Sequence, residues 1–217
     1  MDTSWLGHHR DVVAIDGPDA ATYLQSQASQ DLRGMAVGDE KWTFLLQPTG
    51  KVDVLARVRM VGDERFELDT DPGFGPMLEA RLNRFKIRVK ATVHSSDQLP
   101  SGTALDDAGD EDRRIAAAWP AMGTEIVPGE TIPAETGLAE IAISYTKGCY
   151  PGQELVERMD SRGSAAPRHL TVLPRRPNDE PGTPVTVNGA AIGTVTSVGT
   201  TQVLAYVKRG HDEVARD

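Results

Sequence analysis

The chain has 217 residues, 39% of them hydrophobic and 5% aromatic, which is enough for one large domain or two small ones. Lys and Arg number 23 against 32 Asp and Glu, and the net charge of -9 disfavours general binding to nucleic acids or anionic membranes. The single cysteine, Cys149, excludes an internal disulfide and a cysteine-based zinc or iron–sulfur site built by one chain.

The N-terminal part of the chain alternates apolar runs with helical patterns and predicts an α+β fold. A helix is expected to start at Asp19, and a second helix covers residues 78–85, where apolar residues recur at helical spacing. A turn at residues 48–51 joins two apolar runs into a hairpin. Strands are predicted over residues 12–15, 41–47, 52–60, 65–69 and 87–93.

The middle of the chain is polar, and residues 94–112 are rich in Ser, Gly and Asp, so we expect a mobile acidic loop there. One or two helical turns over residues 113–119 and a strand over residues 141–145 are expected to follow. Beyond a flexible stretch at residues 163–168, short apolar runs alternate with glycine turns and predict a small closed β-barrel. The strands of this barrel are expected over residues 169–173, 184–187, 192–198 and 202–207.

The sharpest motif is K-G-C-Y-P-G-Q-E at residues 147–154, which holds the cysteine. The strand expected before it and the helix expected after it place Cys149 in a strand–turn–helix elbow. A helix N-terminus directs free N–H groups at such a turn, and Lys147 adds a full positive charge, so both features favour the reactive thiolate. The alternative is that Cys149 is a small buried hydrophobic residue, as single cysteines of intracellular proteins often are.

This motif resembles the K-G-C-Y-x-G-Q-E signature of the YgfZ-type folate-binding proteins, which are similar to the aminomethyltransferase (T-protein) of the glycine cleavage system. The resemblance implies an α+β, GcvT-like fold with a ferredoxin-like antiparallel sheet and helices over residues 1–165, followed by a small β-barrel over residues 166–217. It implies that Cys149 is the working thiol and Lys147 its catalytic partner. The further residues that match the motif are Gly148, Tyr150, Gly152, Gln153, Glu154 and Arg158.

The same resemblance implies a tetrahydrofolate-binding accessory protein that supports assembly or repair of iron–sulfur clusters in client enzymes. Its partners would be client or assembly proteins, and the chain alone would hold no tightly bound metal. A folate site needs an apolar slot for the pterin and a cation for the anionic tail. The candidate folate contacts are Trp42, Phe44, Arg57, Arg88, Lys90 and Trp119.

Two other functions stay open, so the sequence does not decide whether the protein is an enzyme. One is a folate-dependent aminomethyl or one-carbon transferase, and the other is a non-catalytic folate sensor or adaptor. Aminomethyltransferases carry a glutamate that reads the pterin where this chain has Ala116, which disfavours aminomethyl transfer.

The expected location is cytoplasmic. No apolar run approaches the roughly 18 residues of a membrane span, and residues 1–10 do not resemble a signal peptide.

Overall fold

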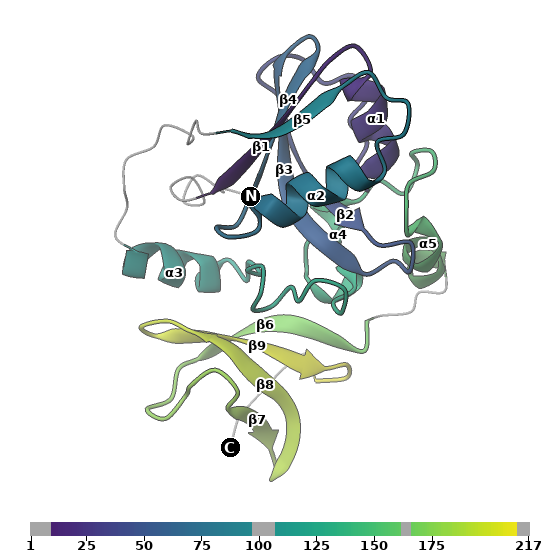
Figure 1. Ribbon diagram of the computed structural model, residues 1–217. Helices are drawn as coiled ribbons and strands as arrows, with labels where there is room; N and C mark the ends of the chain where they lie inside the picture. The colour runs from purple at the N-terminus through teal and green to yellow at the C-terminus, as the bar shows by residue number, and fades with distance from the viewer. Residues whose placement is uncertain (1–9, 97–106, 162–165, 212–217) are drawn as a thin grey trace.

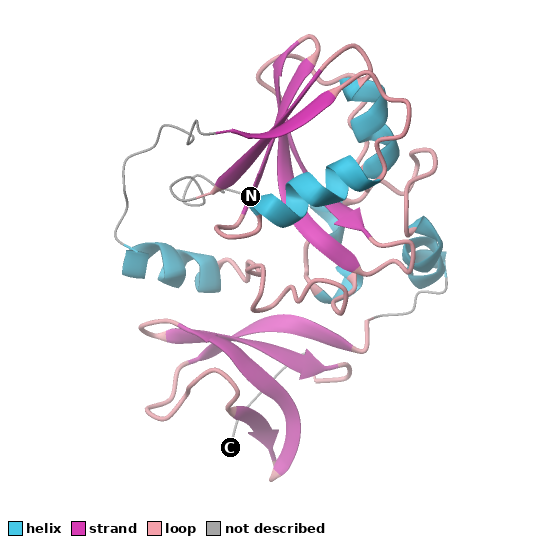
Figure 2. Ribbon diagram, viewed as in Figure 1, coloured by secondary structure: helices cyan, strands magenta, loops and turns pink. Residues whose placement is uncertain are grey.

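The computed structural model describes residues 10–96, 107–161 and 166–211, which form two antiparallel sheets with helices around the first of them (Figures 1 and 2). The strands of the first sheet are β1 (Asp11–Asp16), β2 (Glu40–Leu46), β3 (Val52–Gly62), β4 (Arg65–Thr70) and β5 (Thr92–Ser96). The helices are α1 (Ala20–Gln27), α2 (Gly75–Arg84), α3 (Asp107–Ala116), the 3-10 helix η2 (Pro133–Glu135), α4 (Ala139–Ala142) and α5 (Gln153–Ser161). The second sheet holds β6 (Arg168–Pro174), β7 (Pro184–Val187), β8 (Ala190–Val198) and β9 (Gln202–Lys208).

The first sheet has the strand order β2-β3-β4-β1-β5, and its strand β3 is buried on both faces. Because successive side chains of a strand point to opposite faces, Val54 of β3 packs with α1 and α2, whereas its neighbour Leu55 packs with Trp119 and Tyr150 from later in the chain. The predicted hairpin is confirmed, since β2 and β3 pair antiparallel across the turn that follows Leu46. The predicted α+β fold is confirmed as well.

The four strands predicted for the C-terminal part are confirmed, and they form one sheet with the order β6-β9-β8-β7. In the described residues β6 and β7 are its edges, so the sheet is open and not the closed barrel that was predicted. Its apolar face is a separate small core that includes Val185, Val195 and Val203. The predicted division of the chain at residue 165 stays a prediction, because residues 162–165 lie outside the described part. Among the helices of the described residues, none combines the length and the hydropathy needed to cross a membrane.

A buried polar network ties the second sheet to α3 and to the segment that follows α3. This segment lies between the two sheets (Figure 1). Arg114 of α3 donates to Glu125 Oε2 at 2.9 Å and to Ser197 Oγ of β8 at 2.6 Å. The Ser197 hydroxyl in turn donates to Glu125 Oε1 at 2.6 Å, and the Tyr206 hydroxyl of β9 donates to the Glu125 carbonyl at 2.9 Å. Since Glu125 is fully buried, Arg114 is the cation that compensates its charge.

Two sequence predictions about strands were wrong at particular residues. The predicted strand over 87–93 begins only at Thr92, because Arg88 has a φ of 57° and the Lys90 amide donates to the Asp19 carboxylate beside the start of α1. The predicted strand over 141–145 is instead the end of α4 followed by a turn. Its backbone bonds go to the loop after α1, where the Ser29 hydroxyl donates to the Ala142 carbonyl at 2.6 Å.

The acidic loop predicted over residues 94–112 is too long at both of its ends. Strand β5 continues to Ser96, and α3 already begins at Asp107. The remaining residues, 97–106, lie outside the described part of the chain.

Candidate functional site

The motif forms a loop between α4 and α5, here called the thiol loop (residues 147–152). Cys149 is a free cysteine and is exposed, so the alternative of a buried hydrophobic role for it is wrong. The loop is preceded by a turn rather than by the predicted strand, whereas the predicted helix after it is confirmed as α5. The thiol therefore lies at the surface of a short loop that leads into a helix N-terminus.

Lys147 begins the thiol loop and anchors it to the C-terminal end of α1. Its ammonium group donates to the carbonyl oxygens of Gln25 at 2.7 Å, Ala28 at 2.5 Å and Gln30 at 3.1 Å. It also lies 5.2 Å from the centre of the Tyr150 ring. Burial lowers the pKa of Lys147 to about 8, an effect that the nearby Asp31 carboxylate opposes. The charge of Lys147 is thus directed at a helix end.

Gly152 closes the thiol loop at the other end, where the backbone approaches the turn of the β2–β3 hairpin. Its φ is +84°, and a Cβ atom there would lie 2.4 Å from the Gln47 carbonyl oxygen and 2.9 Å from the Gly50 Cα. Gly50 also has a φ of +84°, and its own Cβ would lie 2.4 Å from the Leu155 side chain. Only glycine fits both positions, which fixes the start of α5 against the hairpin.

The other motif residues divide between the core and the surface. Tyr150 is buried with Leu55 and Trp119 against the first sheet, which raises the pKa of its hydroxyl. Its backbone N–H donates to Gln153 Oε1 at 2.8 Å. Glu154 and Arg158 form an exposed ion pair at 2.5 Å along α5. Such exposed pairs contribute about 0.3–0.5 kcal/mol, so these two residues stabilise the helix only slightly.

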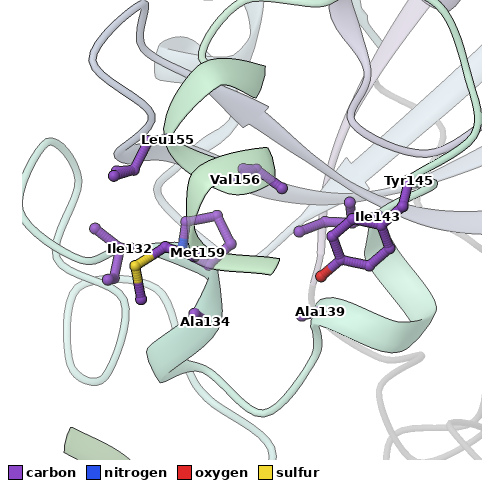
Figure 3. A pocket seen from close by; sticks show the side chains of 9 residues that line it. Ile132, Ala134, Ala139, Ile143, Tyr145, Leu155, Val156 and Met159 are labelled. Atoms are coloured by element: carbon purple, nitrogen blue, oxygen red, sulfur yellow. The ribbon is translucent and has the colours of Figure 1, made fainter. Parts of the chain in front are cut away.

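An apolar pocket lies beside the thiol loop, between α5 and the segment that contains η2 and α4 (Figure 3). Tyr145, which is 45% exposed, contributes a hydroxyl group to a lining that is otherwise apolar. The residues that line it are Ile132, Pro133, Ala134, Ala139, Ile143, Tyr145, Leu155, Val156 and Met159. Helix α5 thus follows the thiol loop directly and also lines the pocket.

The six candidate folate contacts do not form one site. Trp42 and Trp119 do meet, but they pack edge to face with ring centroids 4.7 Å apart and are both buried, so they fill the space between them. Phe44 is fully buried in the same core. Arg88 and Lys90 precede β5, at the opposite edge of the sheet from β2. These residues therefore leave no slot for a pterin with a cation at its end.

Arg57 belongs instead to a buried charge network that the sequence did not reveal. It donates to Asp69 at 2.9 Å and lies over the Trp42 ring, as does Arg10, which also donates to Asp69. Arg10 further pairs with Asp71 at 2.7 Å. The available signal was Arg57, a charged residue at a strand position between the apolar Ala56 and Val58. This signal is ambiguous, because exposed strand faces have the same pattern.

The residues that the structure describes contain no group of three or more His, Cys, Asp or Glu side chains placed to hold a metal ion. The thiol loop therefore provides one exposed thiol and a neighbouring cation that is bound by backbone carbonyls. The apolar pocket is a separate feature that α5 helps to line.

The chain is similar to known proteins both in sequence and in fold. No family model matches the chain. An aminomethyltransferase of Nostoc sp. is 26% identical over 222 residues, which cover 94% of this chain and 53% of that protein. The "Iron-sulfur cluster assembly factor IBA57 homolog, mitochondrial" of Neurospora crassa is 23% identical over 243 residues, which cover 80% of this chain and 55% of that protein. The chain thus spans about half the length of these curated relatives.

The fold has a solved counterpart. The crystal structure of glycine cleavage system aminomethyltransferase T from Bartonella henselae matches with a TM-score of 0.78 at 16% identity, over 93% of this chain and 79% of that one. The relationship predicted from the motif is confirmed. The chain is a relative of the aminomethyltransferases and of an IBA57-type iron–sulfur cluster assembly factor, and it has the aminomethyltransferase fold.

Proposed function

We propose that this protein supports the assembly or repair of iron–sulfur clusters in client enzymes, with Cys149 as its working thiol. The observation that carries the proposal is the exposure of Cys149 on a loop anchored at both ends, in a chain related to an IBA57-type assembly factor. A thiolate is the usual ligand of iron in such clusters, which commonly need four of them. One chain supplies one thiol, so Cys149 would act as a shared or transient ligand together with the thiols of a client or assembly protein.

Tetrahydrofolate is the ligand that the aminomethyltransferase relatives and the shared fold favour, and we include its binding in the proposal. The candidate folate contacts predicted from the sequence do not form a folate site, because Trp42 and Trp119 pack against each other and Arg57 is paired with Asp69. The proposed role of Cys149 therefore does not depend on a bound folate. Anaerobic calorimetric titration with tetrahydrofolate tests the ligand separately: saturable heat near one site per chain supports binding, and no heat up to millimolar ligand removes folate from the proposal.

The cluster role itself predicts a selective loss of enzyme activity. Deletion of the gene in its own host is expected to lower the specific activity of an enzyme with a labile four-iron cluster, while a cluster-free dehydrogenase measured in the same extracts keeps its activity. Returning the wild-type chain is expected to restore the first activity. Equal activities in the deletion and parent strains, under both ordinary growth and oxidative stress, would show that the protein has no such role.

A further inference from the structure

The thiol loop is attached to the rest of the protein at two places that lie close to Cys149 in the sequence. Lys147, two residues before the cysteine, is bound to α1 through carbonyl oxygens. Gly152, three residues after it, is enclosed by the turn of the β2–β3 hairpin. A short segment held at both ends has little conformational freedom, so the position of the thiol depends on both attachments.

The Lys147 attachment is electrostatic and also specific in geometry. The last carbonyl groups of a helix lack partners within the helix and carry partial negative charge, which favours a cation there. The Lys147 ammonium has three N–H donors, and the carbonyls of Gln25, Ala28 and Gln30 accept all three. The positive charge of Lys147 is therefore directed mainly at the carbonyl groups at the C-terminal end of α1.

The loop after α1 that accepts these bonds also holds the segment before the thiol loop. The Gln30 side-chain amide donates to the Ile141 carbonyl at 2.8 Å, and the Ser144 amide donates to the Ser29 carbonyl at 3.0 Å. Residues 141–147 are thus tied to residues 25–30 along their length. Release of Lys147 would free only the last of these ties, the one next to the cysteine.

We propose that Lys147 is the positioning residue of the thiol loop: its ammonium, bound by the carbonyl oxygens of Gln25, Ala28 and Gln30, holds the exposed Cys149 in one place at the N-terminal side of α5. The inference rests on the proposed function only where that function names Cys149 as the working thiol. It replaces the catalytic role predicted for Lys147 with one exerted through the backbone.

A spin label on Cys149 tests this directly, because the chain has one cysteine and the label attaches there alone. In the wild-type protein we expect an electron paramagnetic resonance spectrum of a restricted label. Lys147→Met removes the donors and keeps most of the length of the side chain, and it is expected to give a mobile label. Lys147→Arg keeps the charge and donors and is expected to keep the label restricted.

Lys41→Met is the matched control. Lys41 donates to the neighbouring Asp31 carbonyl at 2.7 Å from strand β2, so it binds the same stretch of backbone but not the thiol loop. It is expected to leave the label restricted. A restricted label in folded Lys147→Met, or equal mobility in Lys147→Met and Lys41→Met, would overturn the proposal. The mobility of the label is measured without any cluster enzyme. Failure of this inference can therefore be distinguished from failure of the proposed function.

A titration of the wild-type protein gives a second test that does not depend on a variant folding. Asp31 and Arg33 act electrostatically on Lys147, and Lys41 donates to the Asp31 carbonyl. The Tyr150 ring lies 5.2 Å from the Lys147 ammonium. Since burial lowers the pKa of Lys147 to about 8, raising the pH from 7 to 9.5 removes its charge and one donor, while Asp31 and Arg33 keep theirs. The label is expected to become mobile over this range in the wild type and to stay restricted in Lys147→Arg. A label that stays restricted at a pH where the Lys147 amine has lost its proton would contradict the role of the ammonium.

Discussion

Arg114→Met is expected to lower the free energy of unfolding by about 3–5 kcal/mol, because it leaves a fully buried carboxylate without its cation. Arg114 is the partner of Glu125 at 2.9 Å and also donates to Ser197 of the second sheet. Methionine keeps much of the apolar stem, so the loss reports the charge and the hydrogen bonds rather than a cavity. Urea unfolding, followed by circular dichroism, measures the effect.

The matched control is Arg113→Met, at the preceding and exposed position of α3. A surface substitution of this kind is expected to change the free energy of unfolding by less than about 1 kcal/mol. If the two variants unfold at the same urea concentration, the buried Arg114–Glu125 pair does not stabilise the protein as described.

Gly152→Ala is expected to lower the free energy of unfolding by about 3 kcal/mol, from a left-handed backbone cost of about 1–2 kcal/mol and an overlap cost of similar size. The φ of +84° disfavours any side chain, and the new Cβ would lie 2.4 Å from the Gln47 carbonyl oxygen, which cannot move without opening the hairpin turn. The expected result is a lower thermal midpoint together with a more mobile thiol loop.

Gly148→Ala is the control within the same motif. Apart from its two chain neighbours, no described residue lies within 4 Å of the point that an alanine Cβ would occupy at Gly148, and its φ is not positive. Alanine there is therefore expected to change the free energy of unfolding by less than about 0.5 kcal/mol. Loss of stability in both variants, or in neither, would show that the approach of Gly152 to the hairpin does not determine the loop.

The regular parts of the fold could be predicted because local patterns agree with the tertiary contacts. Residues 52–60 alternate between two buried faces of the sheet, and Val156 and Met159 lie on one side of α5. The segment 141–145 could not be predicted, because an apolar run of this length suits a short helix as well as a strand, and the loop after α1 decides between them.

The residues of the candidate site could be predicted from the sequence, but their contacts could not. The motif identified Cys149 and the relationship to aminomethyltransferases, both of which depend on consecutive residues. The partners of Lys147 are more than 110 positions away along the chain, and so no local spacing indicates them. The same holds for the folate contacts, since Trp42 and Trp119 are brought together by the fold alone and then pack against each other.

Complementation of the deletion strain by wild-type and Cys149→Ser chains, expressed at equal levels, tests the central claim most directly. Serine preserves the size and exposure of the side chain but removes the thiolate, so the fold is retained and the metal-binding chemistry is lost. We predict that the wild-type chain restores the cluster-dependent enzyme activity under oxidative stress and that Cys149→Ser does not. Full restoration by Cys149→Ser would contradict the account and leave a non-catalytic adaptor as the function to pursue.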